Sequence, residues 1–214
     1  MSESVRIKIC GVVTPEDAHL AASLGADWVG MILWEGSRRR VPDGMAKEIA
    51  VAARECGAEP VGVFVDGSAG EIADRAKGIG IETVQLHGDR ARAAGSILPA
   101  DLTKIWARDG EREDHMPEDN LLDSKRDWIL LDSPGGGTGK AFPWERCRPP
   151  ETVRWLLAGG LDPENVVEAL RLLKPNGVDA ATGVSDSGGI RKDPDRLKRF
   201  VDAVRGLEEM SNDI

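Results

Sequence analysis

The stretch VRIKICGVVTPEDA, residues 5–18, predicts a β-strand that passes through a short loop into an α-helix. Its first five residues are rich in β-branched side chains, which favour a strand. Pro15 suits the first turn of a helix, and Gly25 suits the end of that helix. Cys10 therefore stands where the strand ends, and this position makes its thiol a candidate for chemistry as well as for packing.

The same unit of a strand followed by a helix recurs along the chain. Further strand-like runs are DWVGMILW at 27–34, PVGVFV at 60–65, TVQLHG at 83–88, DLTKIWA at 101–107, WILLD at 128–132, TVRWLLAGG at 152–160 and GVDAATG at 177–183. Helix-like segments lie at 15–25, 43–57, 68–80, 162–174 and 193–205. Strands that alternate with helices predict a parallel sheet with right-handed crossovers.

Eight such units in 214 residues match the size of a TIM barrel. We therefore predict an α/β fold, a single-domain (βα)8 barrel over residues 1–214, because no linker or break in composition divides the chain. A doubly wound open sheet is the alternative, although it would usually need fewer strands. Residues from about 207 to 214 are predicted to form a frayed C-terminal tail.

The charge balance and the cysteines restrict the class of partner. The chain has 28 Lys and Arg against 37 Asp and Glu, and this excess of acid argues against nucleic acid as a partner. Three cysteines without a CxxC pair indicate a reducing compartment and favour neither a disulfide framework nor a zinc site. Without a signal peptide or an apolar run of membrane-spanning length, we expect a cytoplasmic chain with no membrane partner. The sequence favours neither a monomer nor a homodimer.

In a TIM barrel the catalytic groups lie at the carboxyl ends of the strands. The sequence has polar or glycine residues at most of these ends: Cys10-Gly11, Arg38-Arg39-Arg40, His87-Gly88, Asp132, Gly159-Gly160 and Thr182-Gly183. Polar residues are common in any loop, so this pattern acquires weight only with further evidence. Three consecutive arginines in an acidic chain favour an anion site over a solvated turn.

The glycine-rich loop SPGGGTGKAF, residues 133–142, is not a nucleotide-binding motif. A Walker A loop would need glycine in place of Pro134 and a hydroxyl residue in place of Ala141, and a GxGxxG motif would need glycine in place of Lys140. We predict a lid over the active site rather than a flexible linker. Its candidate substrate-binding residues are Gly137, Thr138 and Gly139.

The last two strand ends predict a phosphate site. AGGLDPENV, residues 158–166, places two glycines before a predicted helix with Asp162 as its cap and Pro163 as its first residue. ATGVSDSGGIRKDP, residues 181–194, supplies further exposed backbone N–H groups. Loops after strands 7 and 8 often bind phosphate in this fold, so a phosphorylated small molecule is the predicted ligand.

Lys8 is the predicted electrostatic partner of Cys10. It lies two residues earlier on the same strand, so both side chains leave on the same face. In a closed barrel the eighth strand adjoins the first, which brings Asp179 near Lys8. We therefore predict an ion pair of Lys8 with Asp179 that supports the thiolate of Cys10.

Six motifs in order resemble phosphoribosylanthranilate isomerases, a (βα)8-barrel family of tryptophan biosynthesis. They are KICGVVTPEDA at 8–18, VGVFVD at 61–66, VQLHGD at 84–89, LLDSPGGGTGKAFPW at 130–144, LAGGLDPENV at 157–166 and GVDAATGVSDSGGIRKDP at 177–194. The resemblance implies an Amadori rearrangement of N-(5-phosphoribosyl)anthranilate to 1-(2-carboxyphenylamino)-1-deoxyribulose 5-phosphate. It also implies that neither a cofactor nor a metal takes part.

The resemblance implies roles for individual residues. Cys10 aligns with the general base and Asp132 with the general acid, while Arg39 aligns with the arginine that holds the anthranilate carboxylate. His87 is implied either as a substrate contact or as a backbone hydrogen-bond partner. At the eighth strand, where the family commonly has Ser-Ser-Gly-Val-Glu, this chain has Ala-Thr-Gly-Val-Ser at 181–185. Thr182 and Gly183 still suit phosphate binding, and the lost acidic group leaves Ser185 without an assigned role.

Other phosphate-binding barrels are alternative interpretations. An aldolase would use a Schiff-base lysine, for which Lys104 is the candidate. A barrel similar to thiamine-phosphate synthase would need carboxylates for magnesium and diphosphate. A non-catalytic barrel that binds a phosphorylated metabolite would not need both Cys10 and Asp132.

Overall fold

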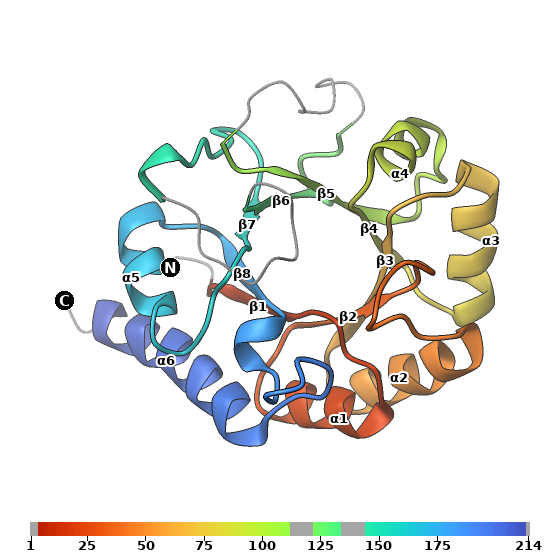
Figure 1. The fold of residues 1–214 in the computed structure, drawn as a ribbon. Coiled ribbons are helices and arrows are strands. Elements are labelled where there is room, and N and C mark those ends of the chain that lie inside the picture. Colours follow the sequence, from red (N-terminus) through yellow and green to blue (C-terminus); the bar gives the residue numbers. More distant parts are fainter. Residues whose placement is uncertain (1–3, 112–121, 134–143, 213–214) are drawn as a thin grey trace.

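The computed structural model describes residues 4–111, 122–133 and 144–212. Parallel strands β1 to β8 form a closed barrel in which each strand pairs with the next and β8 pairs with β1 (Figure 1). The strands are β1 Arg6–Ile9, β2 Trp28–Ile32, β3 Glu59–Phe64, β4 Thr83–Leu86, β5 Thr103–Asp109, β6 Trp128–Asp132, β7 Trp155–Leu157 and β8 Gly177–Ala180. The predicted (βα)8 barrel is confirmed.

Helices surround the barrel as an outer ring (Figure 1). The α-helices are α1 Pro15–Ser23, α2 Asp43–Glu55, α3 Ala69–Ile79, α4 Asp89–Ala94, α5 Val166–Leu173 and α6 Pro194–Asn212. Short 3₁₀ helices are η1 Gly95–Ile97, η3 Trp144–Arg146 and η4 Thr182–Val184. Local sequence explains two helix starts, since Thr14 caps α1 and Ser68 forms a capping box with Glu71 at the start of α3. No helix in the described part of the chain is both long and apolar enough to span a bilayer.

Two hydrophobic clusters hold the barrel together. The larger one lies between the strands and the helices, where small residues such as Ala21 and Ala50 are fully or almost fully buried. The smaller one comprises Trp28, Val61, Ile105, Ala107, Trp128, Leu130, Leu156 and Ala158. The rings of Trp28 and Trp128 meet edge to face with centroids 5.0 Å apart, and both residues are the first of their strands. These indoles therefore fill the end of the barrel that lies opposite the predicted site.

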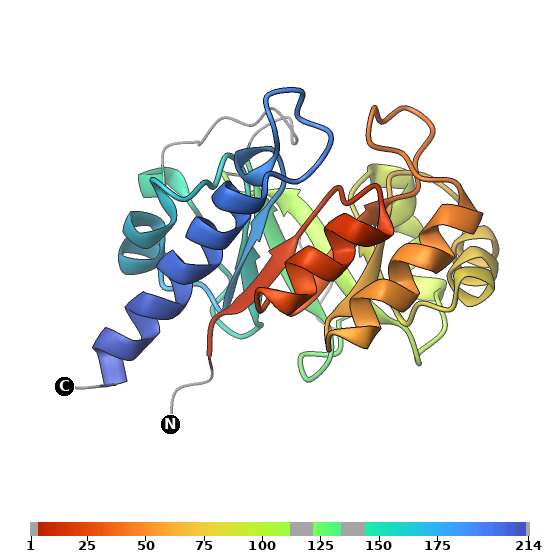
Figure 2. The same ribbon diagram turned by 90° about the horizontal axis from the view of Figure 1, so that it is seen from below.

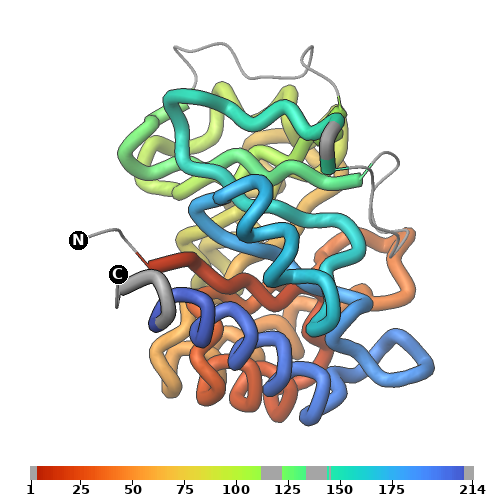
Figure 3. Tube along the Cα trace, turned by 90° about the vertical axis from the view of Figure 1, so that its left-hand side faces the viewer, coloured from red at the N-terminus to blue at the C-terminus, as the bar shows by residue number. Residues whose placement is uncertain are grey.

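The frayed tail predicted from residue 207 is wrong, because α6 continues to Asn212. Leu207 packs against the larger hydrophobic cluster. Arg205 donates a hydrogen bond to the backbone of Val5 at 2.7 Å, and the Glu208 carboxylate accepts the N–H of Val5. The last turns of α6 thus hold the start of β1, and the two segments lie at the same end of the molecule (Figure 2, Figure 3).

Candidate active site

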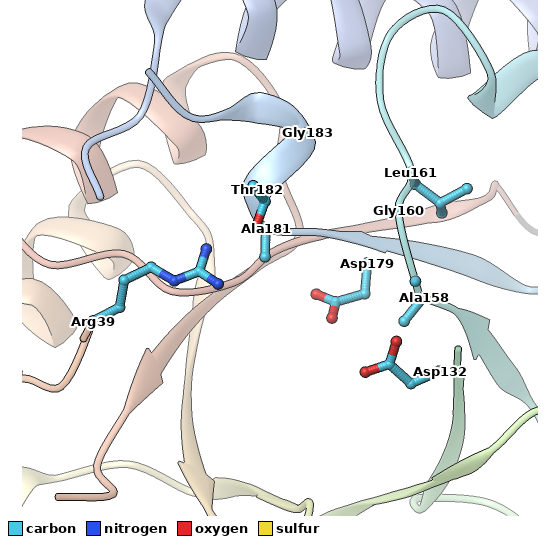
Figure 4. Close-up of a pocket in the computed structure, with 10 residues that line it drawn as sticks. Arg39, Asp132, Ala158, Gly160, Leu161, Asp179, Ala181, Thr182 and Gly183 are labelled. Carbon is cyan, nitrogen blue, oxygen red and sulfur yellow. The ribbon is translucent and has the colours of Figure 1, made fainter. Parts of the chain in front are cut away.

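The carboxyl ends of the strands form a cavity that includes most of the predicted site. Figure 4 shows that the carboxylates of Asp132 and Asp179 and the guanidinium of Arg39 face this cavity from three different elements. Its lining consists of Arg39, Asp132, Ala158, Gly159, Gly160, Leu161, Asp179, Ala181, Thr182 and Gly183. An adjacent cavity, lined in part by His87 and Arg92, shares Asp132 with the first. The Asp132 carboxyl group therefore stands between the two cavities.

Cys10 is buried directly after β1, and its backbone N–H is bonded to Ala180 of β8 at 2.9 Å. The predicted ion pair beneath it is confirmed, because the Nζ of Lys8 lies 2.9 Å from Oδ1 of Asp179. A Cβ at Gly30 of β2 would lie 3.1 Å from both the Lys8 Nζ and the Cys10 Sγ. Glycine at this position therefore leaves the room in which the ammonium and the thiol approach each other.

The Lys8 side chain is fully buried and stays charged because of its neighbours. Burial disfavours the ammonium, but the Asp179 carboxylate and the Cys10 side chain outweigh burial and raise the Lys8 pKa above its ordinary value. A positive charge therefore lies beside the thiol of Cys10. The geometry thus suits Cys10 to act as a base.

Asp132 is the last residue of β6, and its environment suits a proton donor. Burial raises the pKa of its carboxyl group, and the nearby Asp179 carboxylate adds to this effect, whereas His87 and Ser133 oppose it. Its Oδ1 accepts the backbone N–H of Ser133 at 2.8 Å, and its Oδ2 lies 3.7 Å from Nε2 of His87. Desolvation of the charged form therefore favours the protonated acid.

Arg39 is the one of the three consecutive arginines that faces the cavity (Figure 4). Arg38 donates to the carbonyl of Gly188 at 3.4 Å, and Arg40 forms an ion pair with Glu35 at 2.5 Å. The Nη1 atom of Arg39 is buried and has no hydrogen-bond partner among the described residues. Because a buried guanidinium nitrogen needs an acceptor, this donor is available to an anionic ligand.

Glycines shape the two loops of the predicted phosphate site. Gly159 and Gly160 have φ values of +89° and +68°, and a Cβ at Gly159 would lie 2.7 Å from the backbone nitrogen of Ser133. A Cβ at Gly183 would lie 2.0 Å from the carbonyl oxygen of Leu161, so the loops after β7 and β8 touch backbone to backbone. This contact places Thr182, at the start of η4, on the wall of the same cavity.

The predicted start of α5 is wrong by three residues, since the helix begins at Val166 rather than Pro163. The Oδ1 of Asp162 accepts the backbone N–H groups of Glu164 and Asn165, both at 2.9 Å, and so stabilises a turn before the helix. The predicted lid residues Gly137, Thr138 and Gly139 lie outside the described residues.

Sequence reasoning missed Lys192, a buried lysine in the loop after η4. Its Nζ donates hydrogen bonds to the carbonyl of Cys10 at 2.7 Å, to the carbonyl of Ala181 at 3.0 Å and to Oγ of Ser185 at 3.3 Å. Lys192 thus links the loop of the thiol to the predicted phosphate loop, and burial lowers its pKa to about 8. A loop position follows no periodicity, so no sequence signal marks this lysine.

Sequence reasoning also missed Gln85, which is buried on β4. Its Nε2 lies 3.1 Å from Nδ1 of His87. Here a signal existed, because residues two apart on a strand leave on the same face, and the same rule that paired Lys8 with Cys10 pairs Gln85 with His87.

Comparisons with known proteins agree with this geometry. The family model for N-(5'-phosphoribosyl)anthranilate (PRA) isomerase matches residues 7–203. The N-(5'-phosphoribosyl)anthranilate isomerase of Chlamydia felis is 43% identical over 205 residues, which cover 96% of this chain and 99% of the relative.

Two solved structures extend the comparison. Phosphoribosyl anthranilate isomerase from Thermus thermophilus has a TM-score of 0.81 at 31% identity, covering 95% of this chain and 100% of that one. A phosphoribosyl anthranilate isomerase in complex with reduced 1-(o-carboxyphenylamino)-1-deoxyribulose 5-phosphate has a TM-score of 0.74 at 29% identity, covering 94% and 99%. With the family model spanning nearly the whole barrel, the chain belongs to the N-(5'-phosphoribosyl)anthranilate isomerase family.

Proposed function

We propose that this chain catalyses the isomerisation of N-(5'-phosphoribosyl)anthranilate in tryptophan biosynthesis, with Cys10 as general base and Asp132 as general acid. The observation that carries the proposal is that charges of opposite sign lie beside Cys10 and Asp132 at the carboxyl ends of the strands. A buried ammonium lies beside the thiol of Cys10, and a buried carboxylate lies beside the carboxyl group of Asp132. One group is thereby favoured as a base and the other as an acid at the same pH.

Both anionic ends of the substrate, the phosphate and the anthranilate carboxylate, are bound by the protein. The backbone N–H groups around Gly159, Gly160 and Gly183 bind the phosphate, with Thr182 as an additional donor. Arg39 binds the anthranilate carboxylate through its buried, unpaired Nη1. The solved relative that holds the reduced aminodeoxyribulose phosphate supports a ligand that carries both anions.

The first chemical step opens the ribose ring. Asp132 donates its proton to the furanose oxygen while the lone pair of the anthranilate nitrogen forms the C=N bond of the Schiff base. The C–O bond of the ring breaks, and the electron pair stays on the oxygen that has just been protonated. A positioned acid of raised pKa contributes roughly 10²–10⁴-fold to such a step.

The second step moves a proton away from the neighbouring carbon. The thiolate of Cys10 removes the proton from C2' of the sugar, and the electron pair neutralises the iminium to give an enolamine. The enolamine then tautomerises to the aminoketone product. The thiolate is the reactive form of a cysteine, and the Lys8 ammonium beside Cys10 compensates its negative charge during this step.

The fluorescence of freshly prepared phosphoribosylanthranilate measures this activity directly. We expect the purified chain to accelerate the loss of fluorescence in proportion to its concentration, and orthophosphate to compete with the substrate. A decay rate equal to the spontaneous rate at every enzyme concentration would refute the isomerase function. The same assay with chelator present should give an unchanged rate.

The aldolase alternative does not fit the position of its lysine. Lys104 is the second residue of β5, so it lies near the end of the barrel opposite the rim, where it faces Asp127 at 3.9 Å. A Schiff base at this position would not reach a ligand in the Asp132 cavity.

The cysteines in the described part of the chain are all free thiols. We propose the cytoplasm as the place of the reaction. The proposed partner is a small phosphorylated molecule rather than nucleic acid.

A further inference from the structure

Gln85 contacts one ring nitrogen of His87, and Asp132 lies near the other. Gln85 is 2% exposed on β4, and its Nε2 lies 3.1 Å from Nδ1 of His87. On the far side of the ring, Nε2 of His87 lies 3.7 Å from Oδ2 of Asp132. The three side chains therefore form a row that ends at the proposed acid.

The orientation of the Gln85 amide indicates which ring nitrogen of His87 carries the hydrogen. In the structure the NH₂ group of Gln85 is directed at Nδ1 of His87, and because this group only donates, Nδ1 is the acceptor in this arrangement. A neutral imidazole that accepts at Nδ1 carries its hydrogen on Nε2, which is the atom that faces Asp132. Burial lowers the pKa of His87 and so favours the neutral ring.

We propose that Gln85 is a positioning residue for the acid step: it holds His87 in the Nε2–H tautomer, and that N–H group stabilises the Asp132 carboxylate formed when the proton leaves. The inference rests on the proposed isomerase function. The proton moves from Asp132 to the furanose oxygen, and His87 keeps its own proton throughout. The separation of 3.7 Å between Nε2 of His87 and Oδ2 of Asp132 shortens to a hydrogen bond as negative charge develops on Oδ2.

The remaining atoms of Gln85 argue for this role over a purely structural one. Its Oε1 is buried and has no hydrogen-bond partner among the described residues. A side chain selected only for stability would be an apolar residue here, because a buried unsatisfied acceptor is unfavourable. The contact with His87 is thus the one hydrogen bond of the Gln85 side chain within the described part of the chain.

Charged groups from five elements surround His87 and influence whether its ring is neutral or positive. Asp132 on β6 and Asp179 on β8 favour a positive ring, whereas Lys8 on β1 and Arg92 on α4 disfavour it. Arg108 and Asp109 of β5 line the same cavity. Glutamate at position 85 would add an isosteric carboxylate that accepts from Nδ1–H, which reverses the tautomer and favours the imidazolium.

The test compares Gln85→Glu with the wild-type enzyme in the pH profile of kcat. A positive His87 lowers the pKa of Asp132, so the basic limb of the profile should move to lower pH by about one unit. Gln85→Met introduces an apolar side chain of similar size. It should lower kcat but leave the basic limb of the profile at its wild-type pH, because it does not favour the imidazolium. In a His87→Ala background, Gln85→Glu should move the limb much less. An unshifted limb in Gln85→Glu, or an equal shift in both backgrounds, would overturn the proposal.

A second readout does not depend on turnover. The ¹⁵N NMR spectrum of the histidine side chains reports which ring nitrogen carries the hydrogen, and the His87→Ala spectrum assigns the His87 signals. We expect hydrogen on Nε2 in the wild type and on Nδ1, or on both nitrogens, in Gln85→Glu. Hydrogen on Nδ1 in the wild type would overturn the inference even in an active enzyme. Absence of turnover with the expected tautomer would instead refute the isomerase function.

Discussion

The ammonium of Lys8 and the carboxylate of Asp179 form a fully or almost fully buried ion pair of 2.9 Å that lies between the proposed base and the proposed acid. The positive end lies next to Cys10, whose side chain in turn helps to keep Lys8 charged. The negative end is next to Asp132, where it helps to raise the carboxyl pKa. One ion pair therefore presents its positive charge to the proposed base and its negative charge to the proposed acid.

Loss of the positive charge of Lys8 should lower both the stability of the fold and the reactivity of the Cys10 thiol. Lys8→Met leaves the Asp179 carboxylate buried and unpaired, so the free energy of unfolding in urea should fall by about 3–5 kcal/mol. The rate at which iodoacetamide alkylates Cys10 at neutral pH should fall as well. The double variant Lys8→Met/Asp179→Asn should regain stability but not thiol reactivity. Recovery of reactivity in the double variant would contradict the role given to Lys8.

Space at Gly30 should matter for activity more than for folding. In Gly30→Ala the new methyl group would lie 3.1 Å from both Cys10 Sγ and Lys8 Nζ, so both groups must shift by a few tenths of an ångström. We expect kcat to fall by roughly 10–100-fold, because small displacements of a reacting group are costly. Gly44→Ala in α2, where no atom lies within 4 Å of the added methyl group, is the control and should keep full activity. Equal activity of the two variants would show that this space is irrelevant.

The contact between the two phosphate loops should control substrate affinity. In Gly183→Ala the methyl group would overlap the carbonyl oxygen of Leu161 at 2.0 Å, so the loops must separate. We expect KM to rise more than tenfold and competition by orthophosphate to weaken in parallel, since about 1.4 kcal/mol of lost binding corresponds to tenfold. Gly188→Ala, in the exposed part of the same loop, should leave KM unchanged. A normal KM for Gly183→Ala would place the phosphate elsewhere.

The raised pKa of Asp132 has a consequence for stability. Below the unfolded-state pKa the carboxyl group is protonated in both states, and stability is unaffected. As pH rises through the folded-state pKa, the folded protein must bury a charge, so this group makes the wild type progressively less stable. Asp132→Asn removes that penalty. In urea unfolding, the free energy of unfolding of Asp132→Asn minus that of the wild type should therefore increase between acidic and neutral pH. A difference that decreases over this range would contradict the desolvation of Asp132.

Much of the fold follows from local pattern. The alternation of strand and helix predicted the barrel, and the two-residue period of a strand, together with closure of β8 on β1, predicted the contact of Lys8 with Asp179. These features depend on repeated geometry, which a sequence carries explicitly. The length of α6 was missed because its end is stabilised by Arg205 and Glu208 through contacts with Val5, far away in the chain.

The site could be predicted only in part. Strand ends located Cys10 and Asp132, and the family resemblance selected Arg39. Because loop residues have no fixed direction, the structure was needed to show that Arg38 and Arg40 have other partners. Lys192 was missed for the same reason, since its three acceptors lie in the segments that follow β1 and β8, outside the strands. A polar residue that acts through a neighbouring side chain is harder to predict from the sequence than one that stands at a strand end and contacts the substrate.

Turnover of Cys10→Ala and Asp132→Asn in the phosphoribosylanthranilate fluorescence assay tests the central claim most directly, with Cys56→Ala, a half-buried thiol far from the rim, as the control. We predict that kcat falls by roughly 10²–10⁴-fold or more in each of the first two variants, with folding retained, and that the control matches the wild type. Near-normal turnover in a folded Cys10→Ala or Asp132→Asn variant would contradict the assignment of base and acid.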